Sequence, residues 1–243
     1  MKFKNYLFDL YPKYPIGFNL ETRKDPDVCS KELYDDITRI FFSEKGLKKL
    51  GLNSIESKCQ NFGHGDFYTL FIDGDEYLLS SDYIGASVYW AKQAGLSDED
   101  IIECLMISRT IGGHIVFPRG QGMTINQARG GKKGYYDRFD LTLLAIKKWY
   151  LKDISKINYA IENYRNWFSL FKTFDEFISF FMLESFLHNG SIIDLLSSDL
   201  EKEEIELLES EEISIPKDKE EYRRYFNNSN KIIKDRTEKL LSI

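Results

Sequence analysis

The chain has 243 residues, of which 42% are hydrophobic and 15% aromatic, enough for one large core without disulfides or a structural metal. Charged residues make up 30%, but the aromatic content is too high for a disordered chain, and the formal net charge of −6 disfavours nonspecific coating of nucleic acids. No secretory segment and no run of about 18 apolar residues is found, so we expect neither secretion nor membrane spanning.

The first half of the sequence carries the signals for strands. Residues 1–29 show no helical period, and we interpret them as an irregular or strand-containing segment. Ser30 can cap a helix, because the apolar residues that follow share one face. Two β-prone runs at 67–72 and 77–81 flank the turn residues DGDE, which predicts a β-hairpin.

Two further helices and a strand are predicted after the hairpin. Asp82 is expected to cap a helix through Trp90, and Ser97, followed by three acidic residues, is expected to begin a helix that ends at Gly112 and Gly113. HIVFP at 114–118 reads as a strand because it is a short apolar run. The RGQG sequence that follows is expected to turn.

The second half is predicted to be mostly helical. A helix is expected from Asp137, and residues 157–171 repeat apolar side chains with a helical period. Residues 174–187 predict another apolar helix, and Pro216 precedes a final one. No internal repeat is visible.

These elements predict an α+β fold in which a small antiparallel sheet from the N-terminal half packs against a mostly helical C-terminal half. We expect one domain over residues 1–243, with a strand-containing part at about 1–130 and a helical part at about 136–243. Residues 199–221 hold eleven acidic residues and three lysines, typical of a solvated surface segment.

The segment 105–140 is locally basic within this acidic chain. Its charged side chains are Arg109, Arg119, Arg129, Lys132, Lys133 and Arg138, with Asp137 and Asp140. The same segment is rich in glycine, which lets the backbone approach a ligand and offer N–H groups to oxygen atoms. We therefore predict an anion site here, and it is the functional surface that the sequence favours most.

Each candidate residue has a chemical reason. Arginine binds phosphate or carboxylate through two parallel hydrogen bonds, and histidine titrates near neutral pH. The candidate catalytic residues are His114 and Asp140, and the candidate ligand-binding residues are Arg109, Arg119, Asn126, Arg129, Asp137 and Arg138. Tyr135 and Tyr136 lie beside them in sequence and could stack on a base.

Several common sites are not indicated. RGQG and ARGGKKG match neither a Walker A loop nor the dinucleotide fingerprint, and no GxSxG or HExxH motif is found. The three cysteines, with no CxxC spacing, suggest neither disulfides nor a zinc cluster and fit a reducing cytoplasm. We expect no metal and no cofactor.

Several blocks together resemble an uncharacterised bacterial family of unknown function. The blocks are KDPD at 24–27, LSSD at 79–82, GGHIVFPR at 112–119, MTINQARG at 123–130 and DRFDLTL at 137–143. The resemblance covers most of the chain and implies a full-length, single-domain protein, without an activity. In the family pattern the position of His114 alternates with Met, which favours the arginine, asparagine and aspartate candidates over His114.

Three functions stay open at this point. The first is a nucleotide- or RNA-directed phosphoester or transfer enzyme, in which arginines hold phosphates and His114 or Asp140 moves a proton. The second is a non-catalytic protein that binds a phosphorylated ligand or a protein partner. The third is a buried network of arginines and aspartates that only holds the fold. The exposure of the arginine side chains distinguishes these functions. An open pocket lined by arginine favours the first two, and fully paired arginines favour the third.

Overall fold

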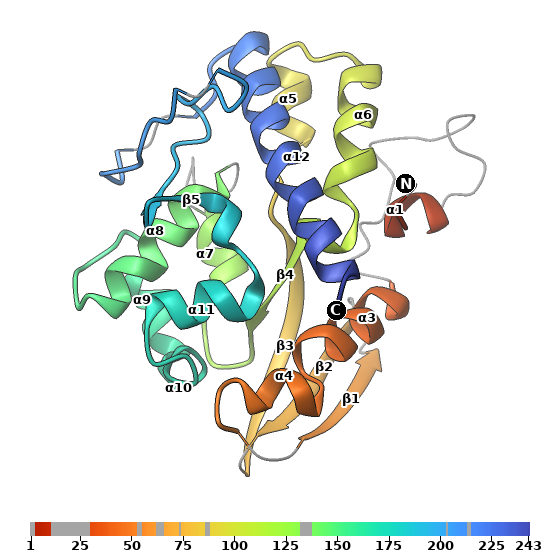
Figure 1. Ribbon diagram of the computed structural model, residues 1–243, viewed down its shortest axis with the longest axis vertical. Coiled ribbons are helices and arrows are strands. Elements are labelled where there is room, and N and C mark those ends of the chain that lie inside the picture. The colour runs from red at the N-terminus through yellow and green to blue at the C-terminus, as the bar shows by residue number, and fades with distance from the viewer. Residues whose placement is uncertain are drawn as a thin grey trace.

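The computed structural model describes residues 3–10, 30–52, 55–61, 66–72, 74–85, 88–131, 138–202, 204–212 and 215–243. Its elements form an antiparallel sheet and two groups of helices (Figure 1). This arrangement confirms the predicted α+β class, in which a small sheet from the first half packs against a helical second half.

The main sheet has four antiparallel strands that follow one another in chain order. They are β1 (Ile55–Asn61), β2 (Asp66–Ile72), β3 (Asp75–Tyr83) and β4 (His114–Pro118). The predicted hairpin is confirmed as β2 and β3, and the predicted strand at 114–118 is β4. Strand β1 is not predicted by its sequence, because IESKCQN has little apolar alternation.

One helix boundary was predicted wrongly beside this sheet. Asp82 does not cap a helix: it lies inside β3 and pairs with Ile115 of β4. The Asp82 carboxylate instead accepts a hydrogen bond from the N–H of the next residue, Tyr83, at 2.9 Å. In a sequence alone, an aspartate that makes this local contact cannot be told from one that caps a helix.

Helices of the first half cover the sheet and extend beyond it. They are α1 (Tyr6–Leu10), α3 (Lys31–Phe41), α4 (Glu44–Lys48), α5 (Val88–Gln93), α6 (Asp98–Ser108) and the short 3₁₀ helix η1 (Ile111–Gly113). Ser30 caps α3 as predicted, its hydroxyl accepting from the N–H of Leu33 at 3.2 Å. Ser97 and Asp100 form a capping box that begins α6. Helix α6 ends at Ser108, earlier than predicted, because η1 follows.

The second half is helical, as predicted. Its elements are α7 (Ile125–Gly131), α8 (Phe139–Tyr150), α9 (Asn158–Asn163), α10 (Arg165–Ser169), α11 (Phe174–Phe181), η2 (Glu184–Phe186), β5 (Leu187–His188), β6 (Ser191–Ile192) and α12 (Lys219–Leu241). The single helix predicted over 157–171 is two helices that meet at Tyr164. Between Asp199 and Asp218 the described residues form no helix, in agreement with the predicted acidic surface segment. No helix among the described residues is long and apolar enough to cross a bilayer.

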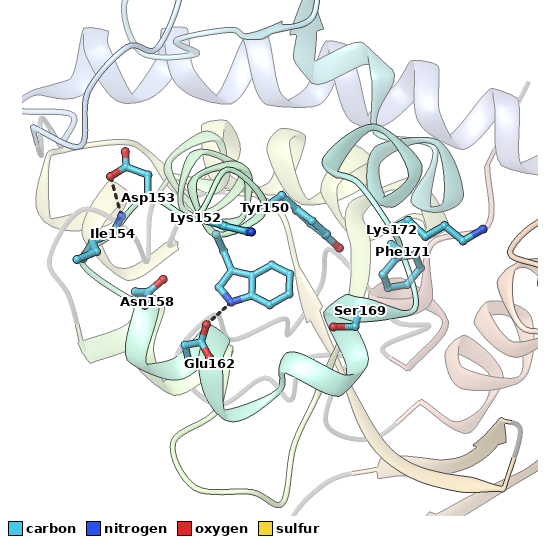
Figure 2. Close-up of a pocket in the computed structure, with 10 residues that line it drawn as sticks. Tyr150, Lys152, Asp153, Ile154, Asn158, Glu162, Ser169, Phe171 and Lys172 are labelled. Atoms are coloured by element: carbon cyan, nitrogen blue, oxygen red, sulfur yellow. Dashed lines mark hydrogen bonds between the residues drawn. The ribbon is translucent and has the colours of Figure 1, made fainter.

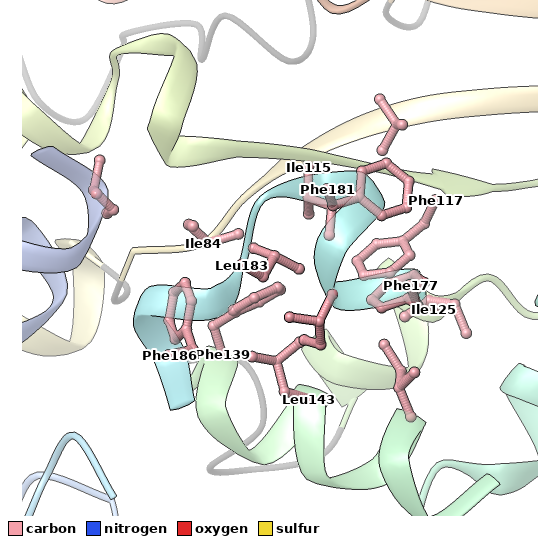
Figure 3. Close-up of a cluster of buried hydrophobic side chains, with 14 of the residues drawn as sticks. Ile84, Ile115, Phe117, Ile125, Phe139, Leu143, Phe177, Phe181, Leu183 and Phe186 are labelled. Atoms are coloured by element: carbon pink, nitrogen blue, oxygen red, sulfur yellow. The ribbon is translucent and has the colours of Figure 1, made fainter. Parts of the chain in front are cut away.

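The core lies between the sheet and the second group of helices. Ile115 and Phe117 of β4 face Phe177 and Phe181 of α11, with Phe139 of α8 beside them (Figure 3). All five side chains are buried, and each buried aromatic side chain contributes about 1.5–3 kcal/mol through the hydrophobic effect.

The final helix α12 crosses the middle of the molecule beside α6 and touches η1 (Figure 1). Glycine at position 112 permits this contact, because a Cβ there would lie 2.5 Å from the carbonyl oxygen of Ile233. Arg236 of α12 is fully buried and donates to the carbonyl oxygens of Gly112 and His114, each at 2.7 Å. Burial lowers the pKa of Arg236 to about 9, so its guanidinium remains cationic at neutral pH. The Gly-Gly-His block therefore packs against α12.

Candidate functional site

The structure brings four of the predicted site residues to the end of strand β3. Arg109, His114, Asn126 and Arg129 surround the β3 residues Ser81, Asp82 and Tyr83, and we call these seven residues the β3 cluster. The cluster joins three sequence blocks that are far apart in the chain. Arg138 and Asp140 form a separate network, Arg119 lines a cavity elsewhere, and Asp137 lies outside the described residues, as do Lys132, Lys133, Tyr135 and Tyr136.

One face of β3 carries the histidine side of the cluster. Tyr83 pairs with His114 across the sheet, and the Arg109 guanidinium lies 3.8 Å from the centre of the Tyr83 ring. Ser81 Oγ and His114 Nδ1 are 3.4 Å apart, and Tyr6 packs edge-on against the imidazole. Ser81, Arg109 and His114 are buried, so the described part of the chain covers these groups.

The opposite face of β3 carries an ion pair. Arg129 of α7 is 3% exposed, and its Nη1 lies 2.5 Å from Asp82 Oδ2. The same guanidinium lies 5.4 Å from the Phe139 ring. Among the described residues, the Nε of Arg129 and the Oδ1 of Asn126 are buried without a hydrogen-bond partner. Buried polar atoms usually have hydrogen-bond partners, so these two atoms stand out within the cluster.

Arg138 and Asp140 are bound to each other rather than presented to an open cavity. Arg138 Nε lies 3.2 Å from Asp140 Oδ1, and Arg138 Nη2 lies 2.6 Å from Asp140 Oδ2 and 2.6 Å from Asp194 Oδ1. Both oxygens of Asp140 also accept backbone N–H groups, from Leu141 and Leu195. Although burial alone would lower the pKa of Arg138, the charges of Asp140 and Asp194 raise it above its ordinary value.

This network connects α8 to the segment that follows β6. Asp194 accepts hydrogen bonds from the N–H groups of Leu196 and Ser197 as well as from Arg138. The side chains of Arg138 and Asp140 are 1% and 0% exposed. The described contacts of this pair thus match the third hypothesis, a buried ion network, whereas its predicted ligand-binding and catalytic roles remain predictions.

Arg119 is the exception among the predicted arginines. Arg109, Arg129 and Arg138 are buried, whereas Arg119 is half-buried at the end of β4. It lines a cavity of about 320 Å³, which we call the Arg119 pocket. The residues lining this pocket are Asp75, Glu76, Tyr77, Leu78, Pro118, Arg119, Gly120, Gln121, Tyr164, Asn166 and Trp167.

The RGQG turn shapes one wall of the Arg119 pocket. Gly120 and Gly122 have φ angles of 99° and 92°, in the left-handed region where glycine is favoured. Tyr164 braces the turn, because its hydroxyl accepts from the N–H of Gln121 at 3.3 Å and donates to the carbonyl of Gly122 at 3.4 Å. Burial raises the pKa of Tyr164, so the hydroxyl keeps its proton at neutral pH.

The sequence did not indicate every residue that lines this pocket. Tyr164 and Trp167 were assigned to the apolar face of a predicted helix, and both are indeed buried, yet they also border the Arg119 pocket. Asp75 and Glu76 belonged to a predicted turn. Their approach to Arg119 follows from the pairing of β3 with β4, which places Leu79 opposite Pro118.

No group of three or more metal-ligating side chains is found in the part of the chain that the structure describes. The family model described as "Family of unknown function (DUF6994)" matches residues 10–240. None of the curated proteins and none of the solved structures matches the chain. The match confirms the resemblance to an uncharacterised family along nearly the full length. The chain belongs to the family of unknown function DUF6994.

Proposed function

We propose that the chain binds a nucleotide or another phosphorylated small molecule in the Arg119 pocket. The observation that supports this most is the position of Arg119, which is half-buried and lines a cavity of about 320 Å³ while the other predicted arginines are buried. Pockets for small ligands are typically roughly 300–1,000 Å³ and carry a few polar groups that fix the ligand.

The charges of the pocket fit a ligand with two kinds of polar group. The guanidinium of Arg119 suits a phosphate, which it can bind through two hydrogen bonds. Asp75 and Glu76 are exposed on the same cavity, and their carboxylates can accept hydrogen bonds from ligand hydroxyl or amino groups. A nucleotide offers both, since its ribose hydroxyls lie several ångströms from its phosphate.

Fewer backbone N–H groups of the RGQG turn are available to bind a phosphate than the sequence suggested. The N–H of Arg119 donates to Leu78 at 2.8 Å, and the N–H of Gln121 donates to Tyr164. With these two groups already used, the phosphate contact falls mainly to the Arg119 side chain.

Replacing Arg119 with alanine is therefore expected to weaken nucleotide binding by about 10- to 100-fold, the value of a hydrogen bond to a charged group. Isothermal titration calorimetry with the nucleotide that most raises the melting temperature of the wild type measures this change. The variant should keep the wild-type melting temperature in the absence of ligand, because Arg119 is only half-buried.

The matched control is Arg39→Ala, which removes an exposed arginine from α3. It should leave nucleotide affinity unchanged. Equal affinities of the wild type, the Arg119→Ala protein and the control would show that Arg119 does not hold the phosphate, and the proposed site would then be wrong.

A second candidate function is catalysis at the β3 cluster, on a phosphoester or in a transfer reaction. The observation that favours it is the 3.4 Å distance between Ser81 Oγ and His114 Nδ1, since a histidine next to a hydroxyl can act as its general base. Asp140 is a weaker candidate for moving a proton, because both of its oxygens accept hydrogen bonds within the network of Arg138.

For this second function, His114→Gln is expected to reduce turnover by about 100-fold or more. The assay measures phosphate or nucleotide release from ATP and from a short RNA, with Ser81→Ala compared in parallel. If the His114→Gln variant turned over substrate as fast as the wild type, His114 would not be a catalytic residue. Absence of turnover by the wild type on both substrates would leave binding at the Arg119 pocket as the better account.

A further inference from the structure

A second cavity, of about 470 Å³, lies between the end of α8, helices α9 and α10, and the segment that precedes α11. Figure 2 shows Asp153 and Ile154 on one side of this cavity and Phe171 on the other, and Trp149 is among the residues that line it. We call it the Trp149 pocket. The residues lining it are Trp149, Tyr150, Lys152, Asp153, Ile154, Asn158, Glu162, Ser169, Phe171 and Lys172. Its lining shares no residue with that of the Arg119 pocket.

The aromatic part of this pocket is held in place by hydrogen bonds. The indole N–H of Trp149 donates to Glu162 Oε1 at 2.7 Å, and the hydroxyl of Tyr150 donates to the carbonyl of Phe168 at 2.7 Å. The rings of Trp149 and Tyr150 meet edge to face, with centroids 4.9 Å apart. Both rings are half-buried, so each keeps some surface for a flat ligand without having to change its orientation.

The charged side chains around the aromatic rings differ in whether they have partners within the chain. Glu162 is occupied by Trp149 and by Arg165, and Asp153 accepts from the N–H of Ile154 at 2.7 Å. In contrast, neither Lys152 nor Lys172 forms an ion pair within the described part of the chain, and both side chains are exposed. The ammonium groups of Lys152 and Lys172 are therefore not held by carboxylates of the described chain.

Lys152 also has an unusual backbone conformation. Its φ angle is 60°, and it follows the end of α8 at a position where helices commonly place glycine. A side chain with a Cβ is strained there, and strained residues cluster at functional sites.

The geometry points to the Trp149 pocket as a binding site for a flat aromatic ring that carries an anionic group. The ring packs against Trp149 and Tyr150, with Phe171 and the exposed Ile154 adding apolar contact. The anionic group lies beside the exposed ammonium group of Lys152. This site is independent of the nucleotide site proposed above.

The test uses naphthalene-1-sulfonate as the probe in isothermal titration calorimetry on the full chain. Naphthalene-1-methanol, which lacks the charge, and methanesulfonate, which lacks the ring, should each bind at least about tenfold more weakly. The double variant Lys152→Gly/Lys172→Ala should lose about tenfold or more in affinity for the sulfonate while its melting temperature stays equal or rises. Lys49→Ala, an exposed lysine at the end of α4, is the matched control and should bind the probe as the wild type does.

A second readout locates the probe. In a ¹⁵N NMR spectrum the indole N–H signal of Trp149, assigned by its loss in Trp149→Phe, should shift on addition of the sulfonate, whereas that of the exposed Trp90 should not. Arg119→Ala should leave both readouts unchanged, so the two proposed sites fail or succeed separately. Equal binding of the sulfonate by the wild type and the lysine double variant, or no shift of the Trp149 signal, would overturn the proposal.

Discussion

Replacing Arg138 with alanine should lower the free energy of unfolding by about 3–5 kcal/mol, because it leaves a fully buried carboxylate without its cation. Asp140 is 0% exposed and loses two hydrogen bonds in this variant, and Asp194 loses one. Equilibrium unfolding in urea at neutral pH measures the change, with the slope of the transition checked for two-state behaviour.

Arg165→Ala is the control for this experiment. Arg165 pairs with Glu162 at 2.6 Å but is 68% exposed, so its loss should change stability by no more than about 0.5 kcal/mol. If Arg138→Ala were as stable as the wild type and instead lost nucleotide binding, Arg138 would be a ligand-binding residue rather than part of a structural network.

Gly112→Ala is expected to be the second most damaging substitution, with a loss of up to about 3 kcal/mol of unfolding free energy from overpacking. The added Cβ would lie 2.5 Å from the carbonyl oxygen of Ile233 and 2.6 Å from the backbone nitrogen of Thr237, besides meeting the Thr237 hydroxyl. Relief would require η1 to move away from α12, which would also strain the hydrogen bonds of Arg236. Thermal and urea unfolding of the variant check this.

A companion variant separates side-chain from backbone crowding at this position. Thr237→Ala added to Gly112→Ala removes the hydroxyl but leaves both backbone atoms in place, so it should not restore stability. Full rescue by the second substitution, or a Gly112→Ala protein as stable as the wild type, would contradict the close packing of α12 on η1.

The sequence predicted those elements whose side chains repeat with a clear period or whose ends carry a capping residue. The helix capped by Ser30, the hairpin of β2 and β3, and the strand at 114–118 are confirmed for this reason. Helix α7 was missed because its sequence, INQARGG, lacks an apolar period and ends in glycines. The break at Tyr164 was missed because the apolar period continues through it.

The candidate site could be predicted as a set of residues but not as an arrangement. Sequence blocks around Ser81, His114 and Arg129 meet at β3 only because β3 pairs with β4 and α7 follows directly. The sequence does not distinguish the arginines of the basic segment from one another, because each contributes the same local charge. The structure shows that these arginines differ in burial and in their partners. Arg138 pairs with Asp194, a residue 56 positions away that no local pattern could indicate.

This difference in burial changes how the basic segment is understood. Arginines that face the core are held by carboxylates, aromatic rings or carbonyl oxygens, as in the pairing of Arg129 with Asp82. Such pairs hold strands and helices in register, and removing one partner is costly. Arg119 differs from them in burial: it is half-buried and lines a cavity at the edge of the sheet, and the proposed function depends on this position.

The most direct test of the account is a thermal-shift comparison of the wild type and Arg119→Ala against nucleoside monophosphates and triphosphates, NAD, cyclic dinucleotides and inorganic phosphate. A ligand that binds the folded state raises the melting temperature by mass action. We predict that at least one phosphorylated compound raises the melting temperature of the wild type and not that of Arg119→Ala. A panel that leaves the wild type unchanged, or that shifts both proteins equally, would contradict ligand binding at the Arg119 pocket.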